Sequence, residues 1–339
     1  MTPRTTVDLA RLDANISRYG KLADEAGVAL RAHVKGHRTP EIAARQVAAG
    51  AVGVAVHSAA EAEAYLAVGV TDVAVAWPWR DPWRWTRFAQ LARHCAVTVH
   101  VDHPDAVTGL GAAAVAHGVA LDVRIEVDTG LHRVGVDPDA AGELATSIAE
   151  TRGLRLAGVT GYVGITDPVT ARDRGDLGRR QAQLLVSVAQ RIRATGAPCP
   201  TVSVGGTPTL LGALGVAGVT EVCAGAYALL DGGLARLGEC APEAVAIAVT
   251  TTVTGIDGQV PRTDADTLLA GADQTWMSGV VMTRPDGTPV AADSVSVGDE
   301  LRVLPGHVCP VVARQPLLHV LDSGEPVARW QALVRPDRA

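Results

Sequence analysis

Lysine is almost absent from this chain of 339 residues. Only Lys21 and Lys35 are lysines, and the remaining basic residues are all arginines. Arginine can replace lysine on a solvated surface, but its guanidinium stays protonated and cannot attack a carbonyl group as a neutral amine. Lys35 lies between two histidines in the run Arg31-Ala-His-Val-Lys-Gly-His37. A lysine retained there is a candidate Schiff-base nucleophile, and a surface lysine with a buried stem is the alternative.

Excess positive charge, long apolar segments and a cysteine framework are also missing. The net charge of -6 and the isoelectric point near 5.9 argue against a nucleic-acid partner. No uncharged apolar run is long enough to span a membrane, and the first dozen residues carry charges instead of an apolar signal core. The five cysteines are scattered and odd in number, which is typical of a reduced compartment. We therefore expect a cytoplasmic protein that does not bind membranes.

Eight short β-branched runs, each followed by a helical pattern, occupy the first two thirds of the chain. Aromatic residues make up only 3% of the sequence, which suits close contacts between helices and strands. This alternation predicts a (β/α)8 barrel over residues 10–240, since a doubly wound sheet would need a glycine-rich dinucleotide turn after an early strand. The predicted strands are Val28–His33, Val52–Val56, Val73–Ala76, Val97–Val101, Val123–Val127, Leu156–Tyr162, Val202–Val204 and Glu221–Cys223.

Helix signals agree with this division. Pro40 and Gly50 would begin and end one helix, and Ser58 with Glu61 forms a capping box for the next. After residue 240 the pattern changes to strands joined by turns such as Asp286-Gly287 and Asp322-Ser-Gly324. We expect an antiparallel β-domain over residues 241–339, together with residues 1–9. Its predicted strands are Val245–Val253, Ser278–Thr283, Glu300–Leu304, Leu317–Leu321 and Val327–Val334.

Candidate active-site residues follow the first and seventh barrel strands. Strand alternation would direct Arg31, His33 and Lys35 toward the barrel mouth, where active groups of such barrels gather. The run Val204-Gly-Gly-Thr-Pro-Thr209 follows the seventh strand, a usual place for a phosphate site, and its glycines would let backbone amides approach an anion. A phosphate-bearing aldehyde cofactor would need both this loop and the amine of Lys35.

The run Pro305-Gly-His-Val-Cys-Pro310 offers an imidazole and a thiol two residues apart. On a strand, His307 and Cys309 would project from one face and form a pair of soft ligands suited to zinc; an ordinary edge strand is the alternative. Two protein ligands cannot make a closed structural site, so a metal there would keep positions open for water or substrate.

These three runs, together with Asp128-Thr-Gly-Leu-His-Arg-Val-Gly135, resemble the D-serine dehydratase and D-threonine aldolase family. The four motifs occur in the family's order and span nearly the whole chain. The resemblance implies a fold-type III pyridoxal 5'-phosphate enzyme with an alanine-racemase-like barrel, usually a homodimer. It implies that Lys35, beside His33, forms the Schiff base, and that Gly205, Gly206, Thr207 and Tyr227 hold the phosphate. It also implies that Arg133 and Tyr162 line the cofactor ring and that His307 and Cys309 bind a divalent metal.

The resemblance also favours one reaction over others. Family aldolases tend to carry a carboxylate at the second metal position and dehydratases a cysteine, so Cys309 favours a zinc-dependent dehydratase of a β-hydroxy D-amino acid, with manganese or magnesium as other possible metals. Ile165 stands where members commonly have a histidine that serves as an aldolase base, and Gly36 replaces the usual threonine. Retro-aldol cleavage, racemisation and cofactor binding without turnover are the alternatives.

The loop Trp77–Trp85 contains four tryptophans. It would lie near the dimer interface or form a wall of the substrate pocket, with packing as its main role.

Overall fold

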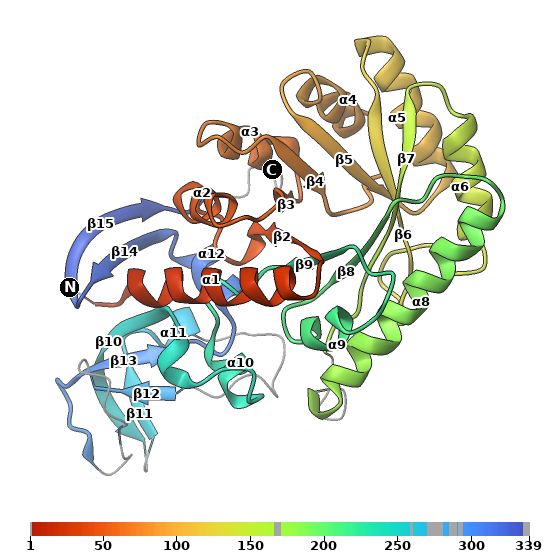
Figure 1. Cartoon of the computed structure of the whole chain (residues 1–339). Coiled ribbons are helices and arrows are strands. Elements are labelled where there is room, and N and C mark those ends of the chain that lie inside the picture. Colours follow the sequence, from red (N-terminus) through yellow and green to blue (C-terminus); the bar gives the residue numbers. More distant parts are fainter. Residues whose placement is uncertain are drawn as a thin grey trace.

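A closed barrel of eight parallel strands forms the larger part of the molecule (Figure 1). The computed structural model describes residues 2–165, 171–257, 260–269, 281–284, 290 and 294–334. All eight predicted barrel strands are confirmed, with small shifts at their ends. They are β2 (Ala29–His33), β3 (Val54–Val56), β4 (Asp72–Val75), β5 (Ala96–Val101), β6 (Leu121–Glu126), β7 (Leu154–Tyr162), β8 (Thr201–Gly205) and β9 (Glu221–Ala224).

Two of the helices around the barrel, α2 and α3, begin where the sequence predicts them to begin. Ser58 accepts a hydrogen bond from the backbone N–H of Glu61 at 3.2 Å, while proline occupies the first turn of α2, α4 and α5. The helices are α1 (Leu9–Glu25), α2 (Pro40–Ala48), α3 (Ala59–Leu66), α4 (Pro82–Leu91), α5 (Pro104–His117), α6 (Ala141–Glu150), α8 (Arg174–Ala194) and α9 (Leu210–Leu214). No helix among the described residues combines the length and the apolar character that a membrane span requires.

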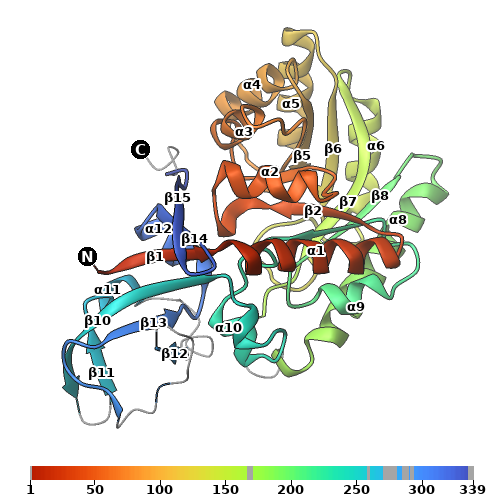
Figure 2. The same cartoon turned by 60° about the vertical axis from the view of Figure 1, so that its left-hand side comes forward.

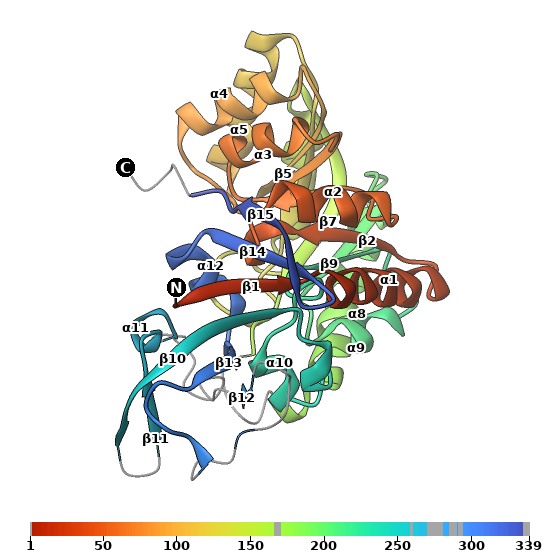
Figure 3. The same ribbon diagram turned by 90° about the vertical axis from the view of Figure 1, so that its left-hand side faces the viewer.

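A second sheet lies beside the barrel and contains the N-terminal strand β1 (Arg4–Asp8) (Figure 2). Its strand order is β12-β13-β10-β1-β14-β15, and β11 pairs with β10. All pairings are antiparallel except that of β1 with β14 (Figure 3). The other strands are β10 (Ile247–Asp257), β11 (Val260–Thr263), β12 (Val281–Thr283), β13 (Glu300–Leu304), β14 (Leu317–Asp322) and β15 (Glu325–Gln331).

The predicted strands of this sheet are present, and β11 is an addition that the sequence did not suggest. The turn at Ser323 and Gly324 joins β14 to β15, and both residues have a positive φ, as such tight hairpins require. Residues 278–280 and the Asp286-Gly287 turn lie outside the described residues. The described residues also form the short helices η1 (Val34–Gly36), α10 (Gly232–Arg236), η2 (Pro242–Ala244), α11 (Asp266–Leu269) and α12 (Val308–Arg314).

The barrel interior contains a buried ion network. Glu221 on β9 accepts hydrogen bonds from Arg31 at 3.0 Å and from Arg124 on β6, and Ser203 also donates to it at 2.7 Å. Arg31 in addition donates to Asp72 at 2.7 Å. The prediction that Arg31 faces the barrel mouth is therefore wrong, because its carboxylate partners hold it inside the barrel and away from the cavity described next.

Candidate active site

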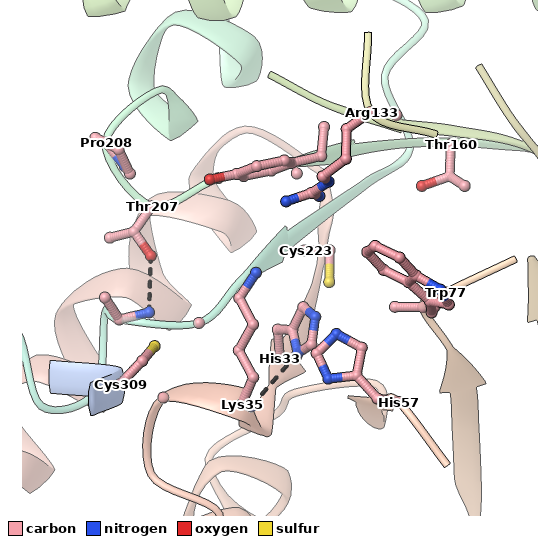
Figure 4. A pocket seen from close by; sticks show the side chains of 18 of the residues that line it. His33, Lys35, His57, Trp77, Arg133, Thr160, Thr207, Pro208, Cys223 and Cys309 are labelled. Carbon is pink, nitrogen blue, oxygen red and sulfur yellow. Dashed lines mark hydrogen bonds between the residues drawn. The ribbon is translucent and has the colours of Figure 1, made fainter. Parts of the chain in front are cut away.

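A cavity of about 610 Å³ opens at the carboxyl ends of the barrel strands and reaches the segment before α12. In Figure 4, Thr207 and Cys309 lie on one side of the Lys35 side chain, and His33 and His57 lie on the other. The structure thus brings most of the predicted site residues together. Those that line the cavity are His33, Lys35, Arg133, Tyr162, Gly205, Gly206, Thr207, His307 and Cys309.

Lys35 reaches the cavity from a turn. Strand β2 ends at His33, and Lys35 lies in the short helix η1, where its backbone N–H points to His33 Nδ1 at 3.5 Å. Strand alternation therefore does not extend to Lys35, although His33 and Lys35 still share the cavity. The Lys35 amine lies 5.0 Å from the centroid of the Tyr162 ring, and the Arg133 guanidinium lies 5.5 Å from the same centroid. The Tyr162 ring thus contacts two cations.

Backbone from two loops forms a narrow cradle near Lys35. Gly206 has φ +120°, and a Cβ there would come within 2.6 Å of Thr209 Oγ1. The hydroxyl of Thr207 accepts a hydrogen bond from the N–H of Ala226 at 3.1 Å, which joins the loop after β8 to the loop after β9. The Thr207 hydroxyl proton remains able to donate. An accessible amine beside glycine backbone and a hydroxyl fits a phosphate-bearing aldehyde.

Gly36 and Tyr227 behave differently from the family pattern. A Cβ at Gly36 would lie 3.3 Å from the carbonyl oxygen of Gly225, so a larger side chain there would require the loop after β9 to shift slightly. Tyr227 is wholly buried and does not line the cavity. Its ring packs on Tyr19 with 5.5 Å between centroids, and its hydroxyl lies beside the side chain of Gln46. Its position gives no support to the prediction that it holds the phosphate.

His307 and Cys309 lie at the start of helix α12 instead of on a strand, so the predicted strand geometry is wrong. His307 is the N-cap residue, and Cys309 lies in the first turn. The Nδ1 atom of His307 is 3.2 Å from Asp231 Oδ2, which also accepts the N–H of Val308 at 3.2 Å. With Nδ1 held by this carboxylate, Nε2 is the ring nitrogen left to bind a metal, which would displace the proton from it.

The charges of this pair favour a thiolate. Burial by itself would lower the pKa of His307, but Cys309 and Asp231 raise it well above its ordinary value. Burial would raise the pKa of Cys309, yet His307 and Lys35 lower it. A thiolate and an imidazole are donors that zinc accepts. Among the described residues, no group of three or more acidic, histidine or cysteine side chains is arranged as a metal site, so an ion bound here would keep open positions.

Sequence reasoning missed two carboxylate–histidine pairs in this cavity. Asp231 holds His307. Asp231 is also the N-cap residue of α10, where its side chain accepts the N–H of Leu234 at 2.9 Å, and this capping position was the only sequence signal that could have pointed to it. Glu126 Oε2 lies 2.9 Å from His100 Nδ1, and both residues line the cavity from neighbouring strand ends. Glu126 therefore holds the His100 imidazole in place. Asp128 does hold backbone, accepting the N–H groups of Gly130 and His132.

Aromatic and apolar side chains complete the walls. Trp77 and Trp79 line the cavity, Trp85 is buried, and Trp83 is exposed. Trp79 Nε1 donates to the carbonyl oxygen of His57 at 2.6 Å, which fixes the loop after β4 to the end of β3. The Trp77 ring lies 5.3 Å from the Arg133 guanidinium. The loop is thus part of the pocket wall, one of the roles that the sequence left open.

Comparison with known proteins agrees with this geometry. The family model described as "Alanine racemase, N-terminal domain" matches residues 7–232. The D-threo-3-hydroxyaspartate dehydratase of Delftia sp. (strain HT23) is 35% identical, with 98% of this chain and 97% of that protein covered. The D-threonine aldolase of Arthrobacter sp is 30% identical, with 98% and 92% covered.

Solved structures give the same result. The structure of the Delftia sp. HT23 dehydratase has a TM-score of 0.87 and 32% identity, covering 98% of both chains. A mutant of that dehydratase in which a cysteine is replaced by alanine was solved in the metal-free form. The D-threonine aldolase from Filomicrobium marinum has a TM-score of 0.84 and 27% identity, covering 98% of this chain and 95% of that one. The chain therefore belongs to the alanine racemase N-terminal domain family, the fold-type III pyridoxal-phosphate enzymes, and the resemblance read from its four motifs is confirmed.

Proposed function

We propose that this protein is a pyridoxal-phosphate- and divalent-metal-dependent lyase that removes water from a β-hydroxy D-amino acid, giving a 2-oxo acid and ammonia. The observation that carries the proposal is that Lys35, the glycine cradle and the His307–Cys309 pair all open into one cavity. The relatives named as a dehydratase and as an aldolase match along nearly the whole chain, which supports the same reaction class.

Lys35 is assigned two tasks. Its amine would hold the cofactor covalently, and in its free form the same amine would accept the proton from the α-carbon of the substrate. Pyridoxal phosphate, when bound, supplies an electron sink for the charge left on that carbon. Thr207 and the amides beside Gly205 and Gly206 would hold the phosphate. Arg133 and Tyr162 flank the Lys35 amine and would orient the ring and the substrate, a role that stays a prediction.

His307 and Cys309 are assigned to the metal. A divalent ion bound there would supply a Lewis acid beside the β-hydroxyl of the substrate. A soft thiolate with an imidazole favours zinc over magnesium, whose preferred ligands are oxygens, with manganese as a further alternative. Asp231 orients His307 from behind. Cys309 in place of a carboxylate is the residue that favours loss of water over carbon–carbon cleavage.

Retro-aldol cleavage to glycine and an aldehyde is the second candidate, because relatives at 28–30% identity are named as aldolases. That reaction needs a base for the β-hydroxyl, and Ile165 lines the cavity at the place where the family commonly has a histidine. A racemase needs no metal ligands such as His307 and Cys309. A protein that binds the cofactor without turnover would not need these two residues in the same cavity as Lys35. Both are therefore weaker candidates.

A substrate panel tests the proposal. Purified protein supplied with pyridoxal phosphate and zinc is incubated with D-serine, D-threonine and longer β-hydroxy D-amino acids, and ammonia, 2-oxo acid and aldehyde are measured together. We expect equal amounts of ammonia and 2-oxo acid. Aldehyde with glycine would establish the aldolase instead, and no product from any substrate would contradict a lyase. Homodimeric assembly and a cytoplasmic location remain predictions.

A further inference from the structure

A loop brings Arg133 into the cavity. Strand β6 ends at Glu126, and the next helix, α6, begins at Ala141. The guanidinium of Arg133 lies 5.3 Å from the centroid of the Trp77 ring and 5.5 Å from that of the Tyr162 ring. Because a loop side chain is not fixed by strand or helix geometry, other contacts must hold this guanidinium in place.

The guanidinium of Arg133 is available to a ligand. Among the ion pairs of the described residues, Glu126 contacts His100 and Asp128 contacts His132, and none includes Arg133. The planar fork of an arginine matches a carboxylate through two parallel hydrogen bonds. Arg133 is therefore suited to bind the carboxylate of an amino-acid substrate, provided that its loop keeps one conformation.

The first carboxylate that holds this loop is Asp128. Its backbone N–H donates to the carbonyl oxygen of Val136 at 2.9 Å and closes the base of the loop. Its side chain accepts the N–H groups of Gly130 at 2.9 Å and of His132 at 3.1 Å. Asp128 thus fixes the backbone that precedes Arg133.

A second carboxylate, Asp102, fixes the backbone that follows Arg133. Asp102 comes directly after β5, the neighbour of β6 in the barrel, and only 5% of its side chain is exposed. Its Oδ2 atom accepts the N–H of Gly135 at 3.1 Å. Gly135 has φ +109°, and a Cβ there would come within 2.4 Å of the backbone nitrogen of Asp128. The loop therefore turns closely at the residue that Asp102 holds.

Asp102 also contacts the loop that carries Trp77. Its Oδ1 atom accepts a hydrogen bond from Arg80 at 3.0 Å, and Arg80 follows Trp77 in the loop after β4. The Trp77 ring in turn packs against the guanidinium of Arg133. One buried carboxylate thus connects the backbone beside Arg133 with the loop that carries its aromatic neighbour.

We propose that Asp102 is a positioning residue for Arg133 and that it sets the affinity of the cavity for the substrate carboxylate. Asp102 does not line the cavity, so it acts only through the loop. A displaced guanidinium would bind less tightly, because hydrogen bonds weaken steeply when they are misaligned. This inference rests on the proposed function, since it assigns Arg133 to the carboxylate of an amino acid.

The test measures ligand binding in the absence of water loss. D-Alanine has an amine and a carboxylate but no β-hydroxyl, and D-alaninamide is the matched ligand without the carboxylate. Each is titrated into the holoenzyme while the absorption of the bound cofactor is followed. Asp102→Ala should weaken the binding of D-alanine at least about tenfold, the size of one charge-assisted hydrogen bond, and leave that of D-alaninamide unchanged.

Three further variants separate this role from a general loss of structure. Asp102→Asn keeps an oxygen that can accept the Gly135 N–H, so the affinity for D-alanine should stay within about threefold of that of the unmodified protein. Arg80→Ala removes only the exposed partner of Asp102 and should weaken D-alanine about threefold, the size of one surface ion pair. Asp105→Ala removes an exposed carboxylate from α5 and should change the binding of neither ligand.

The two ligands also separate this inference from the proposed function. Equal weakening of both ligands in Asp102→Ala, or no weakening of either, would overturn the inference and leave the lyase assignment intact. If Asp102→Ala does not fold, the same comparison in Arg80→Ala decides. An unmodified holoenzyme whose absorption responds to neither ligand would instead remove the proposed function, and this inference with it.

Discussion

At the scale of single residues, the chemistry proposed for the cavity depends on the amine of Lys35, which no arginine can replace. Lys35 is half-buried between His33 and the glycine backbone of the loop after β9, and Lys21 is exposed on α1. The rarity of lysine made this assignment possible without a structure. The position of Lys35 in the turn η1 could not be anticipated. Alternation predicts the direction in which side chains point only for residues that belong to a strand, and β2 ends before Lys35.

The first prediction concerns Lys35→Arg. We expect the purified protein to be yellow and the variant to lose both the absorption band of the bound cofactor and at least about 10²-fold of its activity, because a guanidinium neither forms the Schiff base nor accepts the α-proton. Absorption spectra and turnover with D-serine measure this. Borohydride reduction followed by peptide mapping gives a second readout, and a label on Lys21 would show the assignment to be wrong.

The second prediction concerns the metal. Because only His307 and Cys309 are assigned to hold it, chelation should abolish most of the activity without unfolding the protein or removing the cofactor colour. Activity should return best with zinc. The measurements are activity, metal content and the absorption spectrum before and after chelation. A metal-free enzyme that works at the full rate would show that the ion has no part in the reaction.

A companion experiment replaces the soft ligand. Cys309→Asp should move the metal preference toward manganese or magnesium, since a carboxylate is a harder donor than a thiolate. Product analysis should show more aldehyde relative to 2-oxo acid. Cys95→Ala serves as the control, because Cys95 lies at the end of α4 with its thiol bonded to the Leu91 carbonyl. Unchanged metal preference in Cys309→Asp would place the ion elsewhere.

At the scale of secondary-structure elements, three barrel strands are held together inside by Glu221. This carboxylate lies on β9 and binds arginines from β2 and β6. Burial by itself would raise the pKa of Glu221, but Arg31 and Arg124 lower it to about 2. The residues were visible in the sequence, yet their pairing was not, because Arg31 and Glu221 are far apart in the chain and meet only when the barrel closes.

The third prediction is the stability that this network confers. Because the pKa of Glu221 is about 2 in the folded state and the ordinary value is 4.5, its contribution is complete above about pH 4.5 and is lost as the pH falls toward 2. The loss should amount to about 3 kcal/mol. Urea unfolding between pH 7 and pH 2 measures this contribution.

Glu221→Gln provides the comparison for this titration. At pH 7 the variant should be less stable by roughly 3–5 kcal/mol, because two arginines keep their charge without the carboxylate. Its stability should then depend less on pH in the acid range. Glu300→Gln, which removes an exposed ion pair with Arg4, is the control and should change stability by no more than about 1 kcal/mol. Parallel pH curves for Glu221→Gln and the unmodified protein would contradict this assignment.

The sequence predicted every strand of the barrel, but it predicted the strands of the second sheet less completely. Each barrel strand is a short β-branched run between helix signals, so its presence is encoded locally. The strand β1 and its parallel neighbour β14 come from opposite ends of the chain, and no local pattern states such a pairing. His307 and Cys309 were found by residue type, but their helix was missed because the run was interpreted as a strand, on which alternate residues share a face.

At the scale of the whole molecule, the barrel and the second sheet each supply part of the cavity. Lys35 and the glycine cradle belong to the barrel, whereas His307 and Cys309 follow β13. Chemistry that needs both groups therefore requires the two parts to keep a fixed relation. The contact between Gly36 and Val308, whose side chain would lie 3.7 Å from an added Cβ, shows how closely they approach.

The fourth prediction concerns assembly. We expect a homodimer in which the Trp77–Trp85 loop lies near the interface, because exposed Trp83 leaves a large aromatic surface next to the cavity wall. Light scattering at micromolar concentration, combined with an activity assay on the same sample, measures this. An active monomer would contradict the prediction.

The position of β1 between β10 and β14 also bears on how the chain is made. Thr5 and Thr6 pair on one side with Val249 and Ala248 and on the other with Leu318 and His319. The ribosome makes β1 long before β10 and β14, so this part of the sheet cannot close until β14 has been made. The barrel can form earlier, from strands that are adjacent in sequence. The end of the cavity that contains His307 and Cys309 would then be completed only after the barrel has formed.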